Sequence, residues 1–140
     1  LPVIRMERPS GLPPEKELHR RINKMRMHQG MPELVWIEAL GSVAQTHAGF
    51  ISQRRALTHK AQTHGHLRQR LSAQSLRPSY MSELLVSAQS PLEALEAIQT
   101  SPAHFQQIGH SAINTIGIGV HDGYYVIILA RFKRGKSEVD

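Results

Sequence analysis

Cysteine is absent from the 140-residue chain. This absence excludes disulfide bridges, thiolate metal sites and a cysteine nucleophile. Aromatic residues make up only 5% of the sequence, with a single tryptophan, so aliphatic side chains must fill most of the core. No run of 18 apolar residues occurs, and the sequence therefore predicts no membrane-spanning helix. The length is that of one domain with one core.

Acidic residues are outnumbered by basic ones. The net charge of +6 and the isoelectric point near 10.2 favour a polyanionic neighbour: nucleic acid, anionic lipid or an acidic cell envelope. The basic residues are not interleaved with aromatic side chains on which bases could stack. This composition disfavours a dedicated nucleic-acid-binding protein.

The chain divides into three segments by composition. Residues 1–13 carry three prolines and a glycine, which predicts an extended lead-in. Residues 14–132 contain the periodic apolar patterns and form the expected domain. Residues 133–140, with the sequence "KRGKSEVD", are expected to be a flexible basic tail.

Hydrophobic spacing predicts mostly helices in the first part of the chain and two strands at its end. We expect helices from Pro14 to the stop at Gly30, over 37–53, as a short turn at 67–71, and from Pro91 onward behind Ser90 as N-cap. Strands are expected over 80–88, 113–121 and 124–132, the last two joined by an Asp122-Gly123 hairpin turn. The order predicts an α+β fold with helices on both faces of a small mixed or antiparallel sheet.

Several motifs, taken in order, resemble a known family. The stretch "INKMRMHQGMPELVWIEALGSVAQTHAGFI", followed by "SELL", "SPAH" and "TIGIGV", resembles the CAP superfamily of cysteine-rich secretory, antigen 5 and pathogenesis-related proteins, and its short bacterial members most closely. The similarity covers about residues 14–132. The matching positions are Asn23, Arg26, Gly30, Leu34, Trp36, Leu40, Ala44, His47 and Ala48.

The resemblance implies a three-layer α-β-α sandwich located outside the cytoplasm, with a cleft that holds two histidines and an acid. In this chain these are His59, His104 and Glu83. Family members often bind a divalent metal, commonly zinc, through the two histidines, and proposed activities include lipid binding, proteolysis and cell-envelope roles. The chain departs from the family pattern at Ser82, Leu84, Ile98, Ser101 and Thr115.

Each candidate site residue has a structural alternative. Glu83 is either a buried structural acid or a base that activates a metal-bound water. His64 and His66 either complete a metal site or are solvated loop residues. Ser101 is either a nucleophile beside His104 or, as we expect, a helix N-cap, and Tyr80 either lines the cleft or only forms sheet.

Two functions follow from these alternatives. The first is a binding domain at the cell envelope, whose His59, Glu83 and His104 cleft holds a divalent metal or a small ligand, with anionic envelope components or lipid as partners. The second is a zinc-assisted hydrolase of peptide or cell-wall bonds. His47, on an amphipathic helix, is expected to be packed and hydrogen-bonded and not a ligand.

Overall fold

A four-stranded mixed sheet forms the centre of the molecule. The computed structural model describes residues 10–60 and 65–133, and its strands lie in the order β1-β3-β4-β2. β1 pairs in parallel with β3, whereas β4 pairs antiparallel with both β3 and β2. The strands are β1 (Val35–Trp36), β2 (Tyr80–Ser87), β3 (Thr115–His121) and β4 (Tyr124–Arg131).

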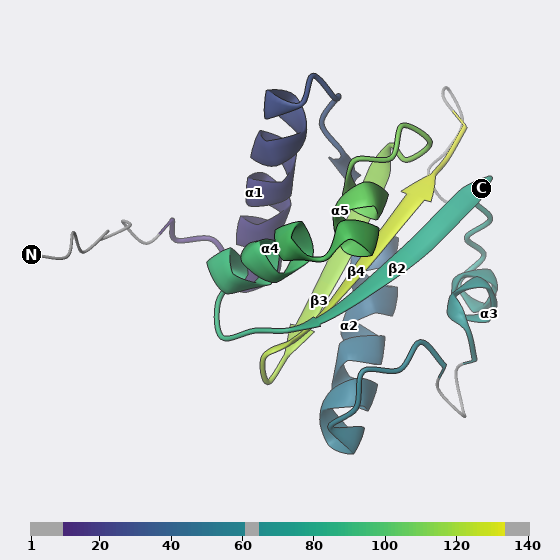
Figure 1. Ribbon diagram of the computed structural model, residues 1–140. Coiled ribbons are helices and arrows are strands. Elements are labelled where there is room, and N and C mark those ends of the chain that lie inside the picture. Colours follow the sequence, from purple (N-terminus) through teal and green to yellow (C-terminus); the bar gives the residue numbers. More distant parts are fainter. Residues whose placement is uncertain (1–9, 61–64, 134–140) are drawn as a thin grey trace, which may run out of the picture.

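Helices cover both faces of this sheet, as Figure 1 shows. One outer layer consists of α1 (Pro14–His28), α4 (Pro91–Thr100) and α5 (Pro102–Ile108). The other consists of α2 (Glu38–Arg54) and α3 (Leu67–Ala73). The predicted α+β class and layered arrangement are therefore confirmed. No helix in the described ranges is long and apolar enough to cross a bilayer.

Alternating side chains of the strands supply the two core clusters. On β2, Leu84 and Val86 pack with α1, α4 and α5, while Leu85 packs with α2 and α3. β4 alternates in the same way, since Tyr125 and Ile127 face the first layer and Val126 faces the second. Successive residues of one strand thus serve opposite layers, and Glu83, two residues before Leu85, lies on the α2 and α3 face.

Two glycines of β3 let α2 approach the sheet closely. A Cβ atom at Gly117 would collide with the backbone of Leu40 and Gly41, and one at Gly119 with the backbone of Ala44 and Gln45. Any larger residue at either position would push the helix away from the strand.

Local signals in the sequence explain most element boundaries. The Ser90 hydroxyl accepts a hydrogen bond of 3.1 Å from the Glu93 N–H, and Pro91 begins α4, as predicted. Asp122 and Gly123 have φ values of 48° and 79°, which is the positive pair that a type I′ hairpin turn requires.

Two elements were missing from the predicted order. β1 has only two residues, too few for a periodic pattern, and is held in place by its pairing with β3. α5 follows α4 after a single residue, Ser101, where the sequence indicated only a turn with an N-cap. The predicted lead-in and basic tail fall largely outside the described residues.

Candidate functional site

The acid predicted for the cleft, Glu83, forms a buried ion pair with Arg70 of α3. The guanidinium donates from Nη1 to Oε2 and from Nη2 to Oε1, each at 2.7 Å. Only 4% of the Arg70 side chain and 2% of the Glu83 side chain are exposed. Because the two bonds are parallel and both groups are buried, this contact fixes β2 against α3.

Arg70 also holds the loop that precedes α3. Its Nη2 donates to the His59 carbonyl at 3.0 Å, and its Nε donates to the Gly65 carbonyl at 3.2 Å. One guanidinium therefore connects the edge strand, the short helix and the backbone of the histidine that the family resemblance places in the cleft.

His59 is oriented by the same carboxylate. Its Nδ1 lies 3.0 Å from Glu83 Oε1. The carboxylate is ionised and can only accept, so Nδ1 carries the hydrogen, and in the neutral form of the ring the lone pair is on Nε2. The side chain is 58% exposed. This is the arrangement in which a carboxylate positions a histidine so that its second nitrogen can bind a ligand.

Burial and bonding act on the charge of Glu83 in opposite directions. Burial alone would raise the pKa of this carboxyl, but hydrogen bonds from His59 and Arg70 and the charge of Arg70 outweigh it and lower the pKa. Glu83 is therefore ionised near neutral pH, because its hydrogen-bond partners stabilise the charged form.

His47 hydrogen-bonds the backbone of the residue before His59. Its side chain, on α2, is fully buried, and Nε2 lies 2.7 Å from the carbonyl oxygen of Thr58. A carbonyl can only accept, so Nε2 carries the hydrogen and donates. Burial, followed by the charge of Arg70, lowers the pKa of His47 and keeps the ring neutral, with no hydrogen-bond partner for its Nδ1 among the described residues. The prediction of a packed, hydrogen-bonded His47 is confirmed.

The other predicted histidine, His104, comes from the opposite layer. It is partly buried on α5, which packs on the face of the sheet away from Glu83. The sheet separates the two layers, so their side chains can meet only around an edge or beyond an end of the sheet, and β2, which carries Glu83, is an edge strand. No group of three or more His, Asp or Glu side chains in the described ranges could hold a metal ion. The shared His59 and His104 site stays a prediction.

The remaining candidates lie near α3 and α5. Tyr80 stacks on His110, with ring centroids 5.0 Å apart. Ser101 occupies the predicted N-cap position of α5, but its side chain makes no capping bond. His66 is exposed at the start of α3, where its backbone N–H donates to Gln69 Oε1 at 2.8 Å. His64 lies outside the described residues.

Arg70 is the site residue whose role the sequence did not reveal, since it counted as one of the basic residues and, with Leu71, as part of the resemblance to the family's short helix. A usable signal was present. Leu67, Arg70 and Leu71 follow the i, i+3, i+4 spacing of one helix face, so the arginine falls on the apolar side of a short helix. An arginine in that position needs a buried acceptor, and Glu83 is that acceptor.

The fold agrees with the comparison to known families. The model of the CAP family, described as the cysteine-rich secretory protein family, matches residues 19–128. This range is more than half of the chain, and the protein therefore belongs to the CAP family. No curated protein matches the sequence.

Solved bacterial structures share the fold. An extracellular protein containing an SCP domain from Bacillus anthracis superposes with a TM-score of 0.80 at 22% identity, covering 84% of this chain and 40% of its own. An outer surface protein of Borrelia burgdorferi gives 0.74 at 22% identity, covering 84% and 92%. A cysteine-rich secretory protein of Staphylococcus aureus gives 0.76 at 19% identity, covering 91% and 42%. The chain thus spans less than half of the Bacillus and Staphylococcus chains.

Proposed function

We propose that this CAP domain is an extracytoplasmic binding domain, and that its site is centred on Nε2 of the exposed His59 side chain. The ligand would be a divalent metal ion or a small polar molecule at the cell envelope. The observation that carries the proposal is the bidentate pairing of Glu83 with Arg70, at 2.7 Å for each bond.

This pairing supports binding over hydrolysis. A general base needs a carboxylate that can reach a water molecule and take up its proton near the working pH. Both oxygens of Glu83 already accept hydrogen bonds, its side chain is almost fully buried, and its partners lower its pKa. The carboxylate is therefore better suited to orienting His59 than to moving a proton.

The residues present fit a metal in one respect. Zinc accepts neutral imidazole nitrogens, and Glu83 holds His59 in the tautomer that leaves Nε2 available. His104 is the second ligand that the family resemblance implies, and two histidines alone make a weak site. When bound, the ion would supply a positive charge that attracts an anionic group of the ligand, and that group would complete the coordination of the ion.

The proposed location has two supports. Two of the similar structures are described as an extracellular and an outer surface protein. The net charge of +6 favours attraction to an anionic envelope component, including lipid headgroups.

Calorimetric titration with zinc chloride near neutral pH tests the proposal. We expect uptake by the wild-type protein, and its loss in the His59→Ala and His104→Ala variants. His28→Ala is the matched control, because His28 is an exposed histidine at the end of α1. Absence of uptake by the wild type, or uptake unchanged in His59→Ala, would reject the metal site.

A second assay separates binding from hydrolysis. The zinc-loaded protein would be incubated with a panel of peptides and cell-wall glycans, and no turnover is expected. Turnover that disappears in Glu83→Gln while zinc uptake persists would favour the hydrolase instead.

A further inference from the structure

A second hollow, distinct from the His59 site, lies where α1 and α4 begin, beside the turn between β3 and β4. Its volume is about 680 Å³, and its lining includes Pro14, Ala88, Glu93, Asp122 and Tyr125. None of the residues that line it is basic, although the chain carries a net charge of +6. The lining includes neither His59, Glu83 nor His104, so its role does not depend on the function proposed above.

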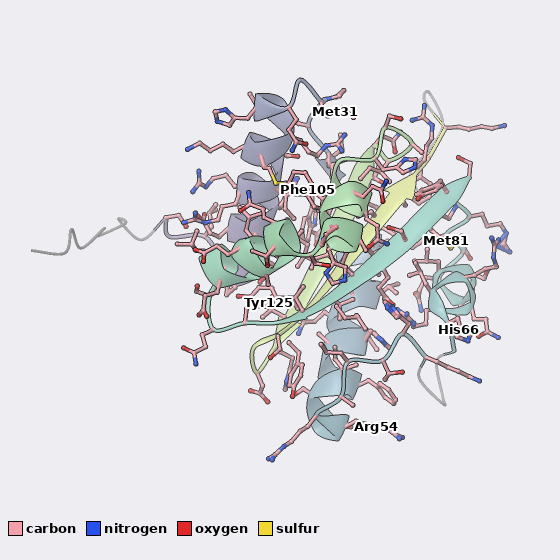
Figure 2. All side chains as sticks on the ribbon, in the orientation of Figure 1. Met31, Arg54, His66, Met81, Phe105 and Tyr125 are labelled. Atoms are coloured by element: carbon pink, nitrogen blue, oxygen red, sulfur yellow. The ribbon has the colours of Figure 1, made fainter. Side chains whose placement is uncertain are left out.

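Tyr125 is the first sign of a ligand. The residue is only 3% exposed, and its ring packs in the core cluster formed with α1 and α4. Its hydroxyl has no hydrogen-bond partner within residues 10–60 and 65–133. Unlike Ser82 Oγ, which is enclosed without a partner among the described residues, the Tyr125 hydroxyl opens on the hollow, and phenylalanine would fill the core equally well. Figure 2 shows Tyr125 between α4 and the β3–β4 turn.

The charge around this hydroxyl is negative. Glu93 and Asp122 line the hollow, and burial together with the charges of Glu15 and Glu93 raises the pKa of Tyr125. Asp122 accepts a hydrogen bond from Ser52 and lies 3.3 Å from His121 Nδ1. The carboxylate of Glu93, by contrast, has no hydrogen bond or ion pair in the described part of the chain.

A helix-capping role explains only part of this arrangement. Glu15 and Glu93 each lie in the first turn of a helix, where a negative charge stabilises the helix dipole. That effect accounts for the two glutamates but not for a tyrosine hydroxyl that opens on the hollow at the edge of the core. Nor do the acids converge on one point, since no three acidic or histidine side chains of the described ranges are grouped closely enough for a metal ion. The hollow therefore fits an extended cation better than a single ion.

We infer that this hollow binds a small organic molecule through a primary alkylammonium group. An ammonium has three N–H donors, and the Tyr125 hydroxyl and the Glu93 carboxylate are acceptors at the hollow. The methylene chain would lie along Pro14 and Val120, which give the hollow an apolar side. Free diamines and lysine side chains of peptides share this chemistry.

Nitrogen-15 NMR titration of the full chain tests the inference. The probes are putrescine, Nα-acetyl-lysine methylamide, choline and the neutral 1,4-butanediol. The two primary amines should shift the amide signals of Ala88, Gly123 and Tyr125. Choline has no N–H donor and should bind more weakly, and the diol should have no effect. The stronger of the two amines identifies the source of the ligand as free diamine or lysine side chain.

Paired variants identify the groups that bind. Tyr125→Phe should weaken putrescine binding about five-fold through loss of one hydrogen bond. Tyr124→Phe is its control, because Tyr124 is the neighbouring residue on the opposite face of β4. Glu93→Gln should weaken binding by about three- to ten-fold, and Glu96→Gln, an exposed acid on the same helix that does not line the hollow, should not.

Three results would overturn the inference. The first is the absence of shifts at Ala88, Gly123 and Tyr125 with either amine. The second is the same response to the diol as to putrescine. The third is equal binding by Tyr125→Phe and Tyr124→Phe together with equal binding by Glu93→Gln and Glu96→Gln, which would show a nonspecific attraction of amines to surface acids.

Discussion

Two polar groups that border the core, the Glu83 carboxylate and the Tyr125 hydroxyl, differ in whether the protein supplies hydrogen-bond partners for them. Both oxygens of Glu83 accept hydrogen bonds, and its partners join three separate segments of the chain. The Tyr125 hydroxyl has no partner in the part of the chain that the structure describes, and the nearby Glu93 is unpaired there too. Groups of the first kind stabilise the fold, whereas groups of the second kind are available to a ligand. Substitutions in the two regions should therefore have different consequences.

The largest effect is expected at Arg70. Arg70→Met leaves the buried Glu83 carboxylate without its partner and should lower the free energy of unfolding by about 3–5 kcal/mol. Adding Glu83→Leu removes the unpaired charge and should restore much of the loss, because an apolar pair can replace a buried ion pair. Urea denaturation of the two variants measures both values. A double variant no more stable than Arg70→Met would contradict this interpretation of the pair.

The second-largest effect is expected from acid, which should weaken the stabilising interactions of the Glu83 carboxylate. The folded pKa of Glu83 lies below its ordinary value of 4.5, so its contribution is complete above pH 4.5 and is lost as the pH falls below it. Glu17 behaves in the same way, since hydrogen bonds from Arg20 lower its pKa to about 2. Stability measured against pH should fall between about 4.5 and 2, and less steeply in the Arg70→Met, Glu83→Leu variant. Equal slopes would show that Glu83 does not take part.

A smaller effect is expected at His47. His47→Phe keeps an aromatic ring beside Phe50, which lies 5.8 Å away between centroids, but removes the hydrogen bond to Thr58. The free energy of unfolding should fall by about 1 kcal/mol. Amide hydrogen exchange at Thr58, His59 and Lys60 should become faster while exchange in β4 is unchanged. Unchanged exchange at His59 would mean that His47 does not fix this loop.

The smallest effect is expected at Tyr125. Tyr125→Phe removes a hydroxyl that has no partner in the described structure, so the free energy of unfolding should change by less than about 0.5 kcal/mol. Thermal unfolding of this variant beside wild type measures the difference. A loss above about 1 kcal/mol would show that the hydroxyl has a structural partner, and the contrast between the two regions would fail.

Elements with strong local signals could be predicted from the sequence. Ser90-Pro91 and Asp122-Gly123 determine their own backbone geometry, and both appear where they were expected. The apolar spacing of residues 37–53 likewise predicts α2 within one residue of its bounds. In contrast, β1 depends on a partner strand about 80 residues further along the chain, and no local pattern could reveal it.

The candidate site was only partly predictable. The family resemblance names His59 and Glu83, and they are in contact, but it does not say that Arg70 neutralises the acid. That pairing joins residues from a helix and a strand, and it follows from tertiary packing and not from sequence spacing. The polar hollow at Tyr125 escaped prediction for the same reason, because a tyrosine on a buried strand has the same sequence pattern whether or not its hydroxyl is bonded.

The close packing of α2 on β3 also affects the position of His59. Gly117 and Gly119 determine how far α2 stands from the sheet, α2 carries His47, and His47 binds the residue before His59. A methyl group added at Gly119 should therefore displace α2, and with it the loop that carries Thr58 and His59. Two positions without a functional group thus help to determine where the His59 ring lies.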